Sequence, residues 1–336
     1  MIDILVELNK VVWGIPVVSL ILGVGILLSV KTKFPQIFLF SGALKNFLRK
    51  LKVKSEKNGA VSPYQALCTA LAATVGTGNI AGVAGAITIG GPGAIFWMWI
   101  CAFFGMTVKF AEVTLAVRYR QKDPSGEYAG GPMYMIRNGM KKSWAFLAGI
   151  YSFFGVVAAF GVGNATQVNA VVNGINEAVI AFGRQETTAG NLLIGTVMAV
   201  LIASILMGGM KRIGYLAERM VPFASVLYLL LGIGVLIVRW DQILPAFTAI
   251  LEGAFSPRAA TGGAVGSFFL TMRVGVSRGV FTNEAGMGTA SIAHAAADVK
   301  HPVEQGLMGI MEVFLDTIVI CTVTALVILV SGVPIP

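Results

Sequence analysis

Charged residues are scarce in this chain, and their scarcity excludes most soluble proteins. Of its 336 residues, 12% are charged and 56% are hydrophobic, whereas a soluble globular protein is about one quarter charged. Histidine and cysteine are rarer still, with two and three residues. The cysteines lie in apolar segments without metal-ligand spacing, so neither a disulfide framework nor a metal centre is indicated. Because no nucleophile and base stand out either, we expect no enzyme.

What is abundant is apolar sequence in runs long enough to cross a bilayer, which takes about 20 residues. Basic residues fall between these runs, so the net charge of +9 indicates membrane topology rather than nucleic-acid binding. If the basic loops face the cytoplasm, the N-terminus lies outside and the chain crosses the cell membrane about eight times. The expected passes are 11–30, 63–90, 94–117, 144–182, 191–207, 216–238, 264–297 and 303–330.

Residues 31–57 form a basic segment between the first two of these passes. Lysine and arginine recur in it against the single acidic residue Glu56, and aromatic and leucine side chains recur at helical spacing. This pattern predicts an amphipathic helix that lies on the inner surface of the membrane.

The most informative segment is 71–93, LAATVGTGNIAGVAGAITIGGPG, which is uncharged and interrupted by Gly-Thr-Gly-Asn. Glycine weakens a helix interior, and backbone groups freed at membrane depth need partners. Interrupted helices are tolerated in lipid mainly where the exposed backbone lines a cavity that binds something. The sequence therefore predicts a membrane transporter that holds its ligand at 75–79. Alternatively, the glycines only allow close helix packing, but packing does not explain the asparagine.

Several motifs resemble one known family. The run 278–288, RGVFTNEAGMG, is similar to the RGxFSNEAGxGSA pattern of the sodium:alanine (alanine or glycine:cation) symporter family. The runs GTGNIAGV at 76–83 and GGPMY at 130–134 also resemble that family, and VGTGN at 75–79 resembles a run in neurotransmitter:sodium symporters. The resemblance extends over essentially the whole chain.

The resemblance implies an all-α polytopic membrane protein with an inverted-repeat (five-plus-five) symporter fold and discontinuous helices at 63–90 and 264–297. By it, residues 1–336 form a single transporter domain with an extra N-terminal span at 11–30. The first repeat is 63–238 and the second begins at 245–332. The last helices of that fold are expected beyond Pro336, so the resemblance implies that the fold is incomplete at its C-terminal end.

Helix chemistry predicts how a zwitterionic amino acid would bind at the first interruption. A helix start offers free N–H groups and a positive dipole end, so we expect the carboxylate against Thr77 and Gly78. Glycine at 76 and 78 lets the ligand reach the main chain, and Asn79 adjoins it. In the resembled family a glutamine on the helix that carries Gln167 contacts the substrate. An interhelical hydrogen bond is the alternative role for this side chain.

Other residues complete the predicted site. By the resemblance, sodium binds the carbonyls of Ala72 and Val75, the hydroxyl of Thr74 and the amide oxygen of Asn79. Near the expected unwound turn of the second discontinuous helix, three apolar residues would form a pocket suited to a methyl side chain, although their spacing is more typical of packing. These residues are Phe269, Met272 and Val276.

Charged residues within the passes are expensive in lipid and point to function. Arg273, Arg278 and Glu284 are expected to form an Arg–Glu pair that gates a cytoplasmic cavity, unless the helix ends earlier and these charges are solvated. Lys109 and Glu112 are spaced as a structural pair. Asp316 lies within the last pass and is suited to carry a proton or to neighbour a cation.

Together these features predict a symporter that moves a small neutral amino acid, alanine or possibly glycine, into the cell with Na+ and without an organic cofactor. One alternative is a proton-coupled carrier that uses Asp316 or Glu284. Another is a membrane subunit that does not itself transport.

Overall fold

The chain folds almost entirely into helices. The structure, a computed structural model, describes residues 14–51, 61–124, 126–255 and 263–333. Its first helices are α2 (Ile15–Lys31), α3 (Pro35–Phe38), α4 (Phe40–Lys50), α5 (Pro63–Thr74), α6 (Val83–Gly90), α7 (Ala94–Tyr119) and α8 (Pro132–Gly139). An antiparallel pair of short strands, β1 (Gln121–Lys122) and β2 (Tyr128–Ala129), lies between α7 and α8.

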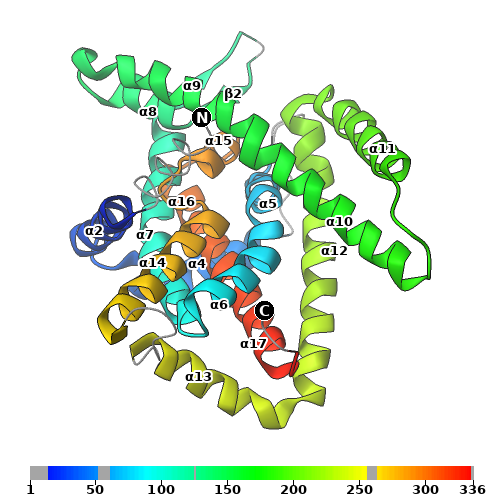
Figure 1. Cartoon of the computed structure of the whole chain (residues 1–336). Helices are drawn as coiled ribbons and strands as arrows, with labels where there is room; N and C mark the ends of the chain where they lie inside the picture. Colours follow the sequence, from blue (N-terminus) through cyan, green and yellow to red (C-terminus); the bar gives the residue numbers. More distant parts are fainter. Residues whose placement is uncertain (1–13, 52–60, 125, 256–262, 334–336) are drawn as a thin grey trace.

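The second half of the chain continues as helices. These are α9 (Phe146–Phe160), α10 (Thr166–Ala181), α11 (Thr188–Leu206), α12 (Gly209–Val238), α13 (Ile243–Phe255), α14 (Gly263–Asn283), α15 (Thr289–Ala295), α16 (Pro302–Val313) and α17 (Thr322–Val330). Wider, π-helical turns occur at η1 (Gly78–Gly82), η3 (Gly161–Ala165) and η5 (Phe314–Cys321). Short 3-10 turns, η2 (Lys142–Trp144) and η4 (Trp240–Gln242), precede α9 and α13. The expected long pass 144–182 is one long helical segment, in which the π-helical turn η3 joins α9 to α10 (Figure 1).

In the part of the chain that the structure describes, five helices are long and apolar enough to cross a membrane. They are 94–119, 142–160, 188–206, 209–238 and 302–330. The pair α5 and η1–α6 makes a sixth, bent by 53° at its break. Of the remaining expected passes, the first is a 17-residue helix, α2, and residues 11–13 lie outside the described residues. The other remaining pass, 264–297, is interrupted and carries arginine residues, so it does not count among these apolar helices. The protein is thus a multi-pass membrane protein.

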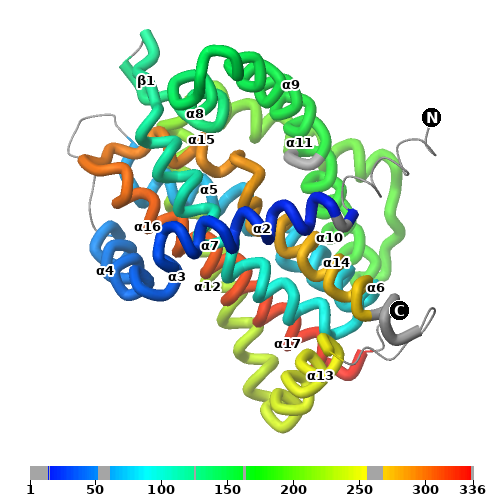
Figure 2. The backbone as a smooth tube through the Cα atoms, turned by 90° about the vertical axis from the view of Figure 1, so that its left-hand side faces the viewer, coloured from blue at the N-terminus to red at the C-terminus, as the bar shows by residue number. Residues whose placement is uncertain are grey.

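Helix α7 is the centre of the molecule. Helices α14 and α16 pack along it, and α2 lies across it (Figure 2). Glycine permits the close approach: a Cβ at Gly275 of α14 would lie 2.3 Å from the Ala94 carbonyl oxygen, and one at Gly306 of α16 would lie 2.1 Å from Thr114 Oγ1. Small residues at such contacts let helix backbones pack tightly in a bilayer, where lipid supplies no hydrophobic drive between helices.

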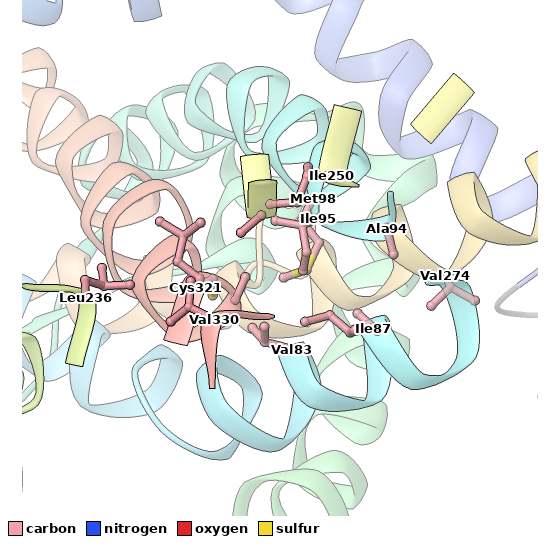
Figure 3. Close-up of a cluster of buried hydrophobic side chains, with 14 residues drawn as sticks. Val83, Ile87, Ala94, Ile95, Met98, Leu236, Ile250, Val274, Cys321 and Val330 are labelled. Carbon is pink, nitrogen blue, oxygen red and sulfur yellow. The ribbon is translucent and has the colours of Figure 1, made fainter. Parts of the chain in front are cut away.

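The largest apolar cluster lies beside this centre. Side chains of α6, α7, α12, α13, α14 and the last helix converge there, including Val83, Ile95, Ile250 and Cys321 (Figure 3). The outer helices differ: most apolar side chains of α9 and α11 are exposed. Exposed apolar patches of that extent are unusual in water, and they suit contact with lipid tails.

The basic segment is helical where it is described. Helix α4 turns Ala43 and Asn46 inward and leaves Leu44 and Leu48 exposed beside Lys45. The expected helix is therefore present over 40–50, its amphipathic role at the membrane surface stays a prediction, and 52–57 lies outside the described residues.

The second discontinuous helix breaks later than expected. Helix α14 is continuous from Gly263 to Asn283, and the interruption falls at 284–288. Glu284, Gly286 and Gly288 have positive φ there, at 52°, 91° and 81°. The expectation of an unwound turn around 269–276 is therefore wrong. Glycine occurs throughout α14, but it does not by itself interrupt the helix. In the described part of this passage, glycine takes the left-handed conformation only after Asn283. Because that conformation ends a helix, the break lies there.

Candidate functional site

The first interrupted helix starts and stops for identifiable reasons. Helix α5 begins with a capping box, in which the Ser62 side chain accepts from the Gln65 N–H and the Gln65 side chain accepts from the Ser62 N–H. It ends at Val75, whose backbone is extended (φ −78°, ψ 101°). The Gly76 N–H then donates to Asn79 Oδ1 at 2.7 Å instead of to the Ala72 carbonyl, its acceptor in a continuous helix. The predicted interruption is confirmed.

Asn79 also ties this break to the last span. Its Nδ2 donates to Asp316 Oδ1 at 2.7 Å and to the Asp316 carbonyl at 3.2 Å. Both residues are buried, at 1% and 0% exposure. Asp316 lies in η5, where the π-helical turn displaces the regular backbone pattern, as it often does at functional sites. A buried carboxylate therefore lies next to the break and is hydrogen-bonded to it through Asn79.

Hydroxyl and amide groups surround the same carboxylate. Thr317 Oγ1 donates to Asp316 Oδ2 at 2.8 Å, and Thr282 Oγ1 lies 3.5 Å from Asp316 Oδ1. Asn283 Nδ2 donates to Thr317 Oγ1 at 3.2 Å, and Asn283 Oδ1 accepts from the Ala285 N–H at 3.0 Å. The last turn of α14 and the break that follows it are therefore connected to Asp316 through side-chain hydrogen bonds.

Most predicted residues of the first break lie together. A Cβ built on Gly76 would lie 3.2 Å from Gln167 Oε1, and one on Gly78 would lie 3.2 Å from the Thr282 backbone. Gln167 of α10 and Thr282 of α14 therefore approach the break from different helices. Thr77 is half-buried between the two glycines. Small residues at 76 and 78 keep the backbone accessible to close neighbours.

The apolar residues of α14 that were predicted to form a substrate pocket do not lie at the first break. Val276 is fully buried in a cluster with Val18 and Cys101, and Met272 packs against the same cluster. Phe269 is 48% exposed. Val276 and Met272 therefore lie on the face of α14 that packs against α2 and α7. Thr282 lies on the face that contacts the broken helix. The pocket prediction fails because it rested on the wrong position for the unwound turn.

Three of the predicted sodium ligands lie in the last turn of α5 or directly after it. Thr74 is buried, and its hydroxyl donates to the Ala70 carbonyl at 3.4 Å. Val75 and Ala72 are at the end of α5, where the helical bonding pattern stops. Among the described residues, no group of three His, Cys, Asp or Glu side chains is arranged for a metal ion. Any cation site here would therefore use neutral oxygens with one carboxylate.

Two residues of this region were missed or misplaced by sequence reasoning. The sequence did not single out Thr282, and it weighed Asp316 without placing it beside the first break. The signal that could have found Thr282 was its place in the 278–288 motif.

The predicted Arg–Glu gate is not formed. Within the described residues, neither Arg273 nor Arg278 makes an ion pair with Glu284. Glu284 instead accepts a hydrogen bond from Thr289 Oγ1, which closes the 284–288 interruption locally. Arg278 lies against Gly85 of the first interrupted helix, and Arg273 is exposed.

The predicted pair of Lys109 with Glu112 is also replaced. Lys109 Nζ lies 3.4 Å from Glu312 Oε1, and both side chains are fully buried. Sequence spacing along one helix proposed the partner, but α16 packs so closely on α7 that a residue distant in sequence supplies the nearer carboxylate.

The sequence matches the model of the sodium:alanine symporter family over residues 1–335. It is 45% identical over 326 residues to the sodium/alanine symporter AgcS of Methanococcus maripaludis, covering 96% of this chain and 69% of the relative. It is 42% identical to an uncharacterized transporter of Haemophilus influenzae, covering 98% of this chain and 70% of that one. It is 38% identical to the putative sodium/proton-dependent alanine carrier protein YrbD of Bacillus subtilis, with 99% and 65% covered.

Proposed function

Because the chain belongs to the sodium:alanine symporter family, we propose that it moves a small neutral amino acid, alanine or glycine, into the cell together with sodium. The observation that carries this proposal is the break between α5 and η1, backed by the buried pair of Asn79 and Asp316. An interrupted helix at membrane depth offers free backbone groups to a zwitterion, and a neighbouring carboxylate offers negative charge to a cation.

The amino acid carboxylate would bind at the start of η1. The first N–H groups of a helix lack acceptors from a preceding turn, and the helix dipole favours negative charge there. Thr77 and Gly78 supply those groups, while the Gly76 N–H is already taken by Asn79. Gln167, which lies beside Gly76, can accept from the ammonium group through its amide oxygen or donate to the carboxylate.

Sodium would bind next to the same break, between α5 and η5. Ala72 and Val75 offer carbonyls where α5 ends, Thr74 a hydroxyl and Asn79 its amide oxygen, and to these we add Asp316 and Thr282. The Asp316 carboxylate supplies the negative charge that makes a cation favourable at this depth. Sodium and amino acid would each stabilise the same backbone conformation, so each would favour binding of the other.

The wider topology belongs to the same proposal. We place the chain in the cell membrane with the N-terminus outside and the basic helix α4 at the cytoplasmic surface. Residues 63–238 would form the first repeat, and 245–332, which includes the undescribed 256–262, would begin the second.

Uptake into proteoliposomes tests the function. Radiolabelled alanine should accumulate when an inward sodium gradient is imposed, and glycine should compete with it. Replacing sodium by potassium or choline should abolish accumulation, and accumulation that persists in choline contradicts the proposal.

A proton-coupled carrier is the second candidate, and the buried carboxylate of Asp316 is the observation that favours it. In the same vesicles, a pH gradient without sodium distinguishes the two. Accumulation driven by the pH gradient alone would assign the coupling to protons.

A further inference from the structure

A second group of buried charges lies one helical turn before Asp316. Lys109 of α7 is 3.4 Å from Glu312 Oε1 of α16, and both side chains have no exposed surface. The other Glu312 oxygen, Oε2, lies 2.9 Å from His294 Nε2 of α15. An ionised group within a membrane span is expensive unless it is paired, so this cluster requires an explanation that packing alone does not give.

One arm of the cluster reaches the beginning of the first interrupted helix. Gln305 Nε2 lies 2.7 Å from His294 Nδ1 and 3.1 Å from the Pro63 carbonyl oxygen. Because that carbonyl can only accept, Gln305 turns its amino group toward both partners. His294 Nδ1 is then the acceptor, and Nε2 carries the proton that it donates to Glu312. The chain of bonds runs from Lys109 to the first residue of α5.

The other arm reaches the interruption of the second helix. His294 belongs to α15, which resumes the second interrupted helix at Thr289, directly after the break at 284–288. Within α15, the Ser291 hydroxyl donates to the Gly288 carbonyl at 2.6 Å, so α15 is bonded to the break itself. One carboxylate, that of Glu312, is therefore paired with Lys109 and reaches both interrupted helices through His294.

We infer that Lys109 is a positioning residue that holds both interrupted helices against α7 by neutralising Glu312, the carboxylate that reaches them. Without the Lys109 charge, Glu312 would be a buried carboxylate with no cation beside it, and it would have to move or become hydrated. Helix α15 and the break before it would shift with His294, and Asn283 connects that break to Thr317 beside Asp316. The consequence for transport rests on the proposed function, but the holding role does not.

The test compares Lys109→Met with the double variant Lys109→Met/Glu312→Gln. Removing one partner of a buried pair is strongly destabilising, whereas replacing both by neutral groups costs little. The amide introduced by Glu312→Gln would keep an oxygen for the His294 N–H, so the double variant retains the contacts to both interrupted helices. Lys211→Met is the matched control, since Lys211 pairs with Glu127 at the surface, where both side chains are about half exposed (52% and 42%).

Hydrogen exchange of the purified full chain gives a readout that is independent of transport. In Lys109→Met, the amides of α15 should exchange faster by about tenfold or more, and the amides of α11, which does not pack on either interrupted helix, should be unchanged. The double variant and Lys211→Met should exchange like the unmodified protein. Unchanged exchange in Lys109→Met, or fast exchange in the double variant as well, would overturn the inference.

Sodium-driven alanine uptake supplies the second readout. Fewer folded molecules would lower the maximal rate and leave KM unchanged, whereas a displaced break should raise KM for alanine in Lys109→Met and restore it in the double variant. A fall in maximal rate alone contradicts the inference. If the unmodified protein shows no sodium-dependent uptake, the proposed function fails, and hydrogen exchange still decides the role of Lys109.

Discussion

At the residue scale, Asn79 connects the features on which the account depends. Its oxygen accepts the Gly76 N–H released by the helix break, and its amino group donates to Asp316. A buried asparagine can satisfy both needs because its amide has an acceptor and two donors. Leucine has a similar size and offers neither, so substitution tests the hydrogen bonds rather than the volume.

We expect Asn79→Leu to raise the sodium concentration for half-maximal alanine uptake by about tenfold or more. The physical reason is that the Gly76 N–H and the Asp316 carboxylate each lose a buried partner, at a cost of about 1–3 kcal/mol per group. Asn164→Leu is the control, because Asn164 is exposed on η3. An unchanged sodium requirement in Asn79→Leu would remove this residue from the site.

Asp316→Asn tests the charge at nearly constant shape. The amide keeps an oxygen toward Asn79 but removes the negative charge that would attract a cation. We expect the sodium concentration for half-maximal alanine uptake to rise by about tenfold or more, since a charge-assisted contact is roughly twice as strong as a neutral one. Asp241→Asn, at an exposed residue that contacts Gln242, should behave like the unmodified protein. Equal sodium dependence in both variants would argue against Asp316 as a ligand.

At the element scale, the spacing between the broken helix and α14 is set by glycine. A Cβ at Gly78 would lie 3.2 Å from the Thr282 backbone, whereas one at Gly82, on the same π-helical turn, finds its nearest atom at 3.9 Å. A larger residue at 78 would therefore force the break and the end of α14 apart, and one at 82 would not.

Gly78→Ala should accordingly impair uptake at least about tenfold, because a backbone cannot yield as a flexible side chain does and overpacking costs about 1–3 kcal/mol. Gly82→Ala should transport normally and fold at least as well, since alanine favours helix over glycine by about 1 kcal/mol. Uptake at saturating and limiting alanine measures both. Equal activity of the two variants would contradict the close contact.

The break at 75–77 was predictable and its partners were not. Glycine next to asparagine in an uncharged apolar run is a local signal, so the interruption, Asn79 and the neighbouring glycines followed from sequence. Asp316 meets Asn79 only through the packing of η5 on the break, across 237 residues of chain. Spacing within one helix misled twice: it paired Lys109 with Glu112, and it placed the turn of α14 before the left-handed residues at 284–288.

At the scale of the whole molecule, the interrupted helices are anchored on one side by α7 and α16. The outer helices α9 and α11 contribute little to this centre. Such an arrangement places the binding region beside a packed core, so a ligand would change the breaks more easily than the helices that hold them.

Equilibrium binding to the purified protein tests the central claim, that sodium and an amino acid bind the same break and stabilise each other. Alanine affinity should rise when sodium is added, and sodium affinity should rise by the same factor when alanine is added, because coupling between two sites is reciprocal. Asn79→Leu should reduce that factor. Alanine affinity that is identical in sodium and in choline would contradict the account.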